Sequence, residues 1–148
     1  MEIERKFTIK DLPKDLDFFP CHVIEQAYLN TDPVVRIRRQ DDDFYMTYKG
    51  KGLMAREEYN LPLNRPSYEH LLTKADGNII SKKRYLIPFP PYTIELDIFD
   101  PPFAPLIIAE VEFSSIKEAE SFLPPDWFDR DVTNDPAYHN STLSKAAF

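Results

Sequence analysis

Short stretches in which apolar and polar residues alternate follow one another along most of the chain. An alternation of period two is typical of a β-strand with one face buried. Pro, Asn and Asp residues separate these stretches, as expected for turns. The pattern predicts eight strands, at residues 2–9, 23–30, 34–40, 43–49, 55–61, 79–86, 92–98 and 106–113.

The connections between these strands predict hairpins. Asp41–Asp43 is a tight turn, so residues 34–49 form one hairpin. Gly50–Gly52 interrupts the next connection, which makes residues 43–61 a second hairpin around a loop.

Helical periodicity occurs in only three places. The segment Pro66–Ala75 has apolar residues at helical spacing, with proline in its first turn. Ser115 and Glu118 form a capping-box pattern that opens a helix through Phe122. A short last helix is predicted at residues 141–147.

The length of 148 residues predicts a single domain covering residues 1–148. The single cysteine, Cys21, excludes an internal disulfide and a cysteine-based metal cluster, and we expect it to be structural. No apolar run approaches the roughly 20 residues that a membrane span needs. The chain also begins with charged residues, unlike a signal peptide. We therefore expect a cytoplasmic protein without a membrane partner, and a net charge of -7 argues against nucleic acid as a partner.

Charged residues follow the same alternation as the apolar ones. On the first strand Glu2, Glu4 and Lys6 share one face, and Ile3 and Phe7 share the other. The two carboxylates lie about 7 Å apart along the strand, a spacing that suits a divalent cation. The arrangement recurs at Arg36 and Arg38, Thr47 and Lys49, Arg56 and Glu58, Lys82 and Arg84, Glu95 and Asp97, and Glu110 and Glu112.

Two architectures agree with this pattern. A two-layer sandwich would expose the charges to solvent, and for any one strand that is the better interpretation. Strict charge alternation on six strands instead favours a closed barrel with the charges inside, and eight strands suffice to enclose one small ligand. Because dry burial of so much charge is prohibitive, the interior would be a wet tunnel for cations and a polyanion. We therefore predict an α+β fold: an eight-stranded antiparallel closed β-barrel, or tunnel, with a charged interior and a few flanking helices. The helices or the second subunit of a homodimer would cover the apolar outer faces.

The ordered set of charged motifs resembles the CYTH domains, also called triphosphate tunnel metalloenzymes, and in particular their short bacterial tripolyphosphatase-like members. The N-terminal Glu-x-Glu-x-Lys signature is Glu2, Glu4 and Lys6. The resemblance continues in order through Arg-x-Arg, the lysine of Thr-Tyr-Lys-Gly, Arg-x-Glu, Lys-x-Arg, Glu-Leu-Asp and Glu-x-Glu. It spans almost the whole chain.

The resemblance implies a tunnel that binds a triphosphate among basic residues and a divalent metal on glutamates. Carboxylate oxygens are hard ligands that suit Mg²⁺ or Mn²⁺. The metal ligands implied are Glu2, Glu4, Glu58, Glu110 and Glu112. The substrate-binding residues implied are Lys6, Arg36, Arg38, Lys49, Arg56, Lys82 and Arg84.

Two catalytic residues are predicted, Lys6 and Tyr28. Tyr28 matches a family position linked to substrate specificity or to protonation of the leaving group, and a packed tyrosine is the equal alternative. Asn60 departs from the family pattern, because it stands where a second glutamate is common. Asp135 is either a metal ligand or a cap of a local turn, and the capping role is favoured. The three histidines, His22, His70 and His139, match no catalytic spacing, which predicts surface or core roles.

These observations predict a Mg²⁺- or Mn²⁺-dependent hydrolase of inorganic tripolyphosphate with side activity on nucleoside triphosphates. A thiamine triphosphatase and an adenylate cyclase of the same family are the alternatives. A binding module for polyphosphate or nucleotides that does not turn over is an alternative of another class, although pure anion binding does not require the acidic pairs.

Overall fold

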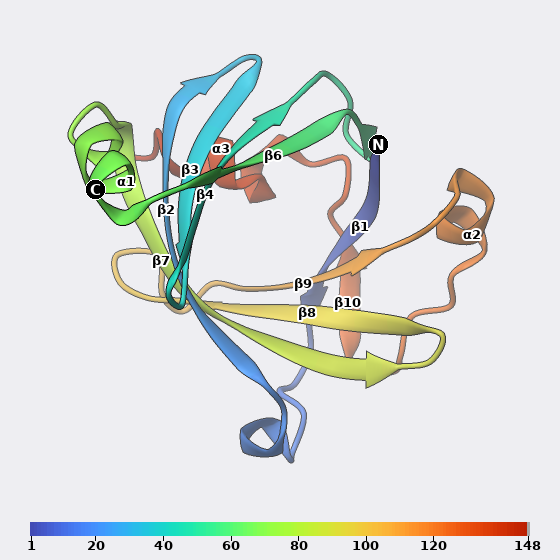
Figure 1. Cartoon of the computed structure of the whole chain (residues 1–148). Helices are drawn as coiled ribbons and strands as arrows, with labels where there is room; N and C mark the ends of the chain where they lie inside the picture. Colours follow the sequence, from blue (N-terminus) through green and yellow to red (C-terminus); the bar gives the residue numbers. More distant parts are fainter. Residues whose placement is uncertain (148) are drawn as a thin grey trace.

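The computed structural model, which describes residues 1–147, contains one antiparallel sheet that curls around a central space (Figure 1). Its strands are β1 (Glu2–Ile9), β2 (Cys21–Thr31), β3 (Val34–Gln40), β4 (Asp43–Lys49), β5 (Ala55–Arg56), β6 (Glu58–Leu63), β7 (Asp76–Phe89), β8 (Tyr92–Phe99), β9 (Ile107–Glu112) and β10 (Phe128–Asp131). The helices are α1 (Arg65–Leu72), α2 (Ile116–Ser121) and α3 (Asn140–Leu143), with 3-10 turns η1 (Leu16–Phe18) and η2 (Pro136–Tyr138).

The sheet is an almost closed barrel. Its strand order is β10-β1-β9-β8-β7-β2-β3-β4-β6, and β5 pairs with the N-terminal end of β1. Only Glu57 separates β5 from β6, which pairs with β4. The chain therefore bridges the two ends of the sheet at this point, where Glu2 pairs with Arg56.

The predicted barrel is confirmed, but the sheet has ten strands rather than eight. The strand expected at 55–61 is split into β5 and β6, because the chain changes partner from β1 to β4 around Glu57. The additional strand, β10, has four residues, of which three are exposed and charged. A segment that short gives no alternation from which a strand could be predicted.

The apolar core lies outside the barrel, as predicted. One cluster surrounds Phe7 and Phe122 and lies between α2 and the strands β1, β8 and β9. A second surrounds Tyr68 of α1, which packs on Ala27 and Ile37. Helices α1 and α2 thus cover parts of the outer faces (Figure 1).

The C-terminal segment packs against β2 through α3 and is hydrogen-bonded to β7. The Asn78 backbone N–H donates to the Ser144 carbonyl, 2.5 Å away, and the Asn78 side chain donates to the Ala146 carbonyl at 2.7 Å. Gly77, with φ of 81°, allows this approach, because a Cβ there would lie 2.1 Å from the Ser144 oxygen. Within residues 1–147, no helix has the length and apolar character needed to cross a bilayer.

Candidate active site

The barrel encloses a cavity of about 400 Å³ whose walls are mostly charged. Every charged residue that the alternation predicted to face inward lines this cavity, with the exception of Asp97, which is fully buried beneath it. Strand pairing places these side chains on the same, inward face of the sheet: Glu4 of β1 lies opposite Glu112 of β9, and Lys6 lies opposite Glu110. The tunnel interpretation is therefore confirmed over the sandwich.

Three carboxylates form a compact acidic group at the β1–β9 wall. Glu2, Glu4 and Glu112 each offer an oxygen within 4.8 Å of the others. Burial, together with Glu110, raises the pKa of Glu4 to about 8. Burial and the nearby carboxylates, Glu95 first among them, raise the pKa of Glu112 to about 7. Such a group is short of positive charge, and its oxygen-only donor set suits a hard divalent cation.

The other two glutamates predicted as metal ligands lie beside basic side chains. Glu110 has carboxylate oxygens 3.7 Å from the Lys6 ammonium and 3.7 Å from the Arg84 guanidinium. Burial alone would raise the pKa of Glu110, but these two cations more than offset it and hold the pKa below its usual value. Glu58 lies 3.5 Å from Lys49 and accepts a hydrogen bond from Asn60 at 2.9 Å.

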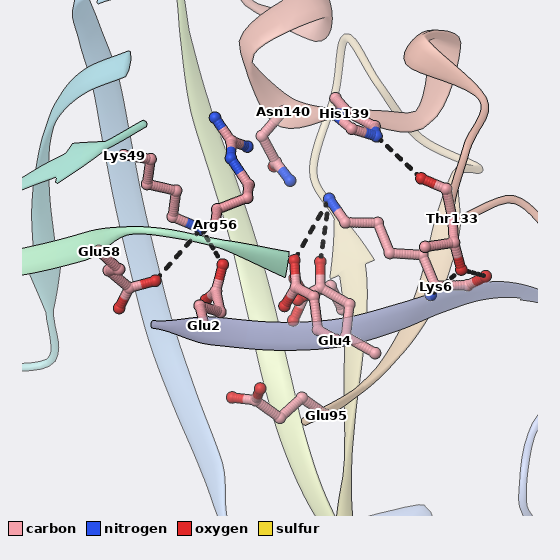
Figure 2. A network of polar contacts seen from close by, with 12 residues as sticks. Glu2, Glu4, Lys6, Lys49, Arg56, Glu58, Glu95, Thr133, His139 and Asn140 are labelled. Carbon is pink, nitrogen blue, oxygen red and sulfur yellow. Dashed lines mark hydrogen bonds and ion pairs between the residues drawn. The ribbon is translucent and has the colours of Figure 1, made fainter. Parts of the chain in front are cut away.

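Both tunnel lysines nearest the acidic group are shared between two carboxylates (Figure 2). Lys6 lies 3.9 Å from Glu4, in addition to its contact with Glu110. Lys49 lies 2.9 Å from Glu2, in addition to Glu58. These ion pairs therefore satisfy the same ammonium groups that could bind phosphate oxygens.

Lys82 and Arg84 are held by a carboxylate below the tunnel wall. Arg84 makes two hydrogen bonds to Asp97, at 2.7 and 2.8 Å, and one to Glu95 at 3.0 Å. Lys82 and Asp97 are both completely buried and lie 2.7 Å apart. Burial lowers the pKa of Lys82 to about 7, and Asp97 only partly offsets it. Asp97 thus serves as the counter-charge for both cations.

Arg36 and Arg38 differ from the other basic tunnel residues. Within residues 1–147 neither forms an ion pair. Arg38 donates to the Gln26 amide oxygen at 2.9 and 2.5 Å, and Arg36 donates to the Thr47 hydroxyl at 3.1 Å. The buried Nε of Arg36 has no hydrogen-bond partner in the described part of the chain. Burial, with the charge of Arg36, lowers the pKa of Arg38. Both guanidinium groups are therefore held by uncharged partners, without a carboxylate in ion-pair contact among residues 1–147.

Some wall residues were not predicted as site residues. Gln40 of β3 and Tyr45 of β4 point inward at the same two-residue spacing as the predicted residues of these strands, so the alternation could have identified them. His139, Asn140 and Ser141 also line the cavity, but they lie beyond the sheet, where no periodicity points to them.

Two further predictions concern residues near the C-terminal segment. Tyr28 lines the cavity but is only 3% exposed and also packs in an apolar cluster with Val34 and Ile80. Asp135 caps η2 by accepting from the Ala137 N–H at 3.0 Å, as the sequence predicted.

A family model described as CYTH domain matches residues 1–124. The chain is 36% identical over 148 residues to an inorganic triphosphatase of Nitrosomonas europaea, a match that covers 97% of this chain and 96% of the relative. It is also 36% identical to an inorganic triphosphatase of Acetivibrio thermocellus, covering 97% of this chain and 93% of that protein.

Solved structures agree with these sequence matches. The crystal structure of an inorganic triphosphatase superposes with a TM-score of 0.73 at 33% identity and covers 99% of this chain and 96% of that one. A Pyrococcus horikoshii protein has a TM-score of 0.63 at 19% identity, covers 98% and 92% of the two chains, and shares the fold.

Proposed function

Because the chain belongs to the CYTH domain family, we propose that it is a divalent-metal-dependent hydrolase of inorganic triphosphate. The similarity inferred from its charged motifs is confirmed by the family match and by two relatives that are inorganic triphosphatases. The observation that carries the proposal is the presence, within one 400 Å³ tunnel, of an acidic group and of an arginine pair that forms no ion pair among residues 1–147.

The acidic group fits a divalent cation, which we propose is Mg²⁺ or Mn²⁺. Glu2, Glu4 and Glu112 would hold it, since their oxygens already converge. When bound there, the cation would offset charge on the phosphate oxygens and lower the pKa of a bound water. Glu58 and Glu110 stay predicted ligands, which would have to exchange their lysine and arginine contacts for the metal.

The basic side chains bind and orient the substrate in this proposal. Arg36 and Arg38 would grip one phosphate through paired N–H donors, because guanidinium groups match phosphate oxygens in geometry. Lys49, Arg56, Lys82 and Arg84 would contact the remaining oxygens as those oxygens replace part of the carboxylate contacts. Positioning and charge stabilisation do most of the work in phosphoryl transfer, so such a wall is suited to the reaction.

Lys6 and Tyr28 are the proposed catalytic residues. The Lys6 ammonium is buried between Glu4 and Glu110, which more than offset the effect of burial and raise its pKa. It therefore stays charged and can stabilise the transferred phosphoryl group. Tyr28 faces the same cavity from β2, where its hydroxyl could donate to the leaving oxygen.

The proposed partner is a small triphosphate, and we expect neither nucleic acid nor a membrane to be bound. Cytoplasmic location and a homodimer stay predictions from the sequence. The side activity on nucleoside triphosphates is also a proposal, as are the alternatives of a thiamine triphosphatase, an adenylate cyclase and a binding module without turnover.

A panel of substrates tests the proposed reaction. Tripolyphosphate, pyrophosphate, ATP, GTP, thiamine triphosphate and long-chain polyphosphate are assayed for phosphate release under one Mg²⁺ condition. We expect tripolyphosphate to be hydrolysed fastest, ATP well behind, and pyrophosphate hardly at all, because it is too short to reach both the acidic group and the arginine pair. Cyclic AMP formed from ATP would contradict the hydrolase assignment, and tight binding without turnover would favour the binding module.

Replacing Arg36 tests the arginine pair. We expect Arg36→Met to weaken tripolyphosphate binding by about 1.5–3 kcal/mol, the range for hydrogen bonds to charged groups. The free energy of unfolding should not fall, since Arg36 has no ion pair to lose and its charge disfavours that of Arg38. Calorimetric titration and urea unfolding measure the two quantities. Arg39→Met is the matched control, because Arg39 lies on the same strand but donates to the Asp41 carbonyl outside the tunnel. Equal losses of affinity in both variants would contradict the assignment.

A further inference from the structure

His139 is a buried titratable residue in the tunnel wall that the proposed mechanism does not use. It lies between η2 and α3, is 8% exposed, and lines the cavity together with Lys6, Tyr28 and Asn140. It also lies beyond residue 124, outside the part of the chain that the family model matches.

The imidazole is fixed in place through Thr133 (Figure 2). Its Nε2 lies 3.2 Å from the Thr133 carbonyl oxygen. A carbonyl only accepts, so Nε2 carries the hydrogen, and Nδ1 is the bare nitrogen of the neutral ring. The Thr133 hydroxyl oxygen in turn accepts from the Lys6 backbone N–H at 3.0 Å. The ring therefore keeps a set position relative to Lys6.

Burial and the charges around the ring favour its neutral form. Burial, and then the cation of Lys6 on β1, lower the pKa of His139, and Arg56 on β5 adds to this effect. The Thr133 carbonyl and Glu110 on β9 oppose it but do not reverse it. A polyanion in the tunnel would reverse the balance, because it would supply the negative charge that the ring lacks.

We propose that His139 is a phosphate-binding residue in the part of the tunnel wall formed by the C-terminal segment, and that it takes up a proton when triphosphate binds. The proton comes from solvent and attaches to Nδ1. The resulting Nδ1–H donates a hydrogen bond to a phosphate oxygen, while the Nε2–H keeps its hydrogen bond to the Thr133 carbonyl. This inference rests on the proposed function, and it adds a protonation step that depends on the substrate.

The chain contains only three histidines, so their imidazole NMR signals can be followed one by one. The wild-type protein is titrated with pH, without and with saturating tripolyphosphate, in the presence of a chelator that prevents turnover. We expect the proton affinity of His139 to rise about tenfold or more with tripolyphosphate, since one close opposite charge suffices for that change. His70, exposed on α1, and His22, which pairs with Asp41 at 2.6 Å, are internal controls that should not move.

Two variants give a second readout. His139→Asn should raise the KM for tripolyphosphate about tenfold near pH 6, with a smaller change in kcat, and the defect should shrink at alkaline pH where the wild-type ring is neutral. His70→Asn should match the wild type and, with His139→Asn, assigns the NMR signals. The NMR titration uses the wild type, so it decides the question even if His139→Asn folds poorly.

The outcomes separate this inference from the proposed function. If calorimetry shows that tripolyphosphate binds in the presence of the chelator, and Mg²⁺ supports its hydrolysis, an unchanged His139 titration would overturn the inference alone. No binding of tripolyphosphate by calorimetry, with or without Mg²⁺, would overturn the proposed function and the inference together. A KM defect of His139→Asn that is equal at pH 6 and pH 9 would overturn the inference alone. A residue with a merely structural role would give such a defect, because its contribution does not depend on the charge of the ring.

Discussion

Replacing Glu4 by glutamine should lower tripolyphosphate hydrolysis at least about 10³-fold, since a Lewis acid contributes several kcal/mol to such a reaction. Glu4 is 5% exposed and lies between Glu2 and Glu112 in the acidic group. Glutamine keeps the shape of the side chain but removes the charge. The loss should appear in kcat, because the interaction with the substrate is strongest in the transition state.

Phosphate release and Mn²⁺ binding measure this effect together. Glu57→Gln is the matched control, since Glu57 is exposed at the junction of β5 and β6. Treatment of the wild type with a chelator should reproduce the loss of activity, and Mg²⁺ or Mn²⁺ should restore it. Hydrolysis at the same rate with and without a chelator would rule out the role of the acidic group.

The acidic group also predicts how the metal requirement depends on pH. In the metal-free protein the pKa of Glu4 is raised to about 8 and that of Glu112 to about 7. Below these values protons occupy the carboxylates and compete with the cation. The Mg²⁺ concentration needed for half-maximal activity should therefore rise as the pH falls from 8 toward 6, and it should depend less on pH in Glu4→Gln.

Replacing Asp97 by alanine should destabilise the protein by about 3–5 kcal/mol, the usual cost of removing one partner from a buried ion pair. Asp97 is fully buried and is the carboxylate that contacts both Lys82 and Arg84. Its removal leaves Lys82 without an ion pair among residues 1–147, and leaves Arg84 with Glu95 and the more distant Glu110.

Urea unfolding at pH 7 measures the loss. Glu95→Ala is the control, since the Glu95 side chain is 21% exposed and, among residues 1–147, forms an ion pair with Arg84 alone. We expect it to cost about 1 kcal/mol or less, as for a more exposed pair. Combining Asp97→Ala with Lys82→Met should recover part of the stability, because the second change removes the stranded charge. A double variant as unstable as the sum of both single changes would contradict this explanation.

The alternation of charges predicted the barrel and most of its wall. Arg36 and Arg38, for example, share a face because strand geometry has a period of two, and no tertiary information is needed to place them together. The same reasoning could not distinguish Arg38 from Arg84, since both are inward arginines. Their difference comes from cross-strand neighbours: Gln26 lies opposite Arg38, and Asp97 lies opposite Arg84.

Other parts of the site depend on contacts that no periodicity encodes. The division of β5 from β6 follows from a change of pairing partner at one residue. His139 reaches the tunnel because Asn78 of β7 binds the backbone of residues beyond it, a contact between segments 65 or more residues apart. The structure was also needed to tell which glutamates converge on one point and which pair with basic side chains. Glu110 and Glu112 lie on the same strand, but Glu110 contacts Lys6 and Arg84 whereas Glu112 belongs to the acidic group.

The balance of charges inside the tunnel determines how a substrate meets the protein from solution. The formal charges of seven basic and seven acidic residues cancel in and beneath the tunnel wall, so the remaining residues carry the formal net charge of -7. A polyanion is therefore repelled at long range and attracted only at the mouth. Added monovalent salt screens that repulsion and should speed the encounter, whereas it slows association for enzymes that steer their substrates electrostatically. Selectivity for triphosphate would then arise within contact distance rather than during diffusion.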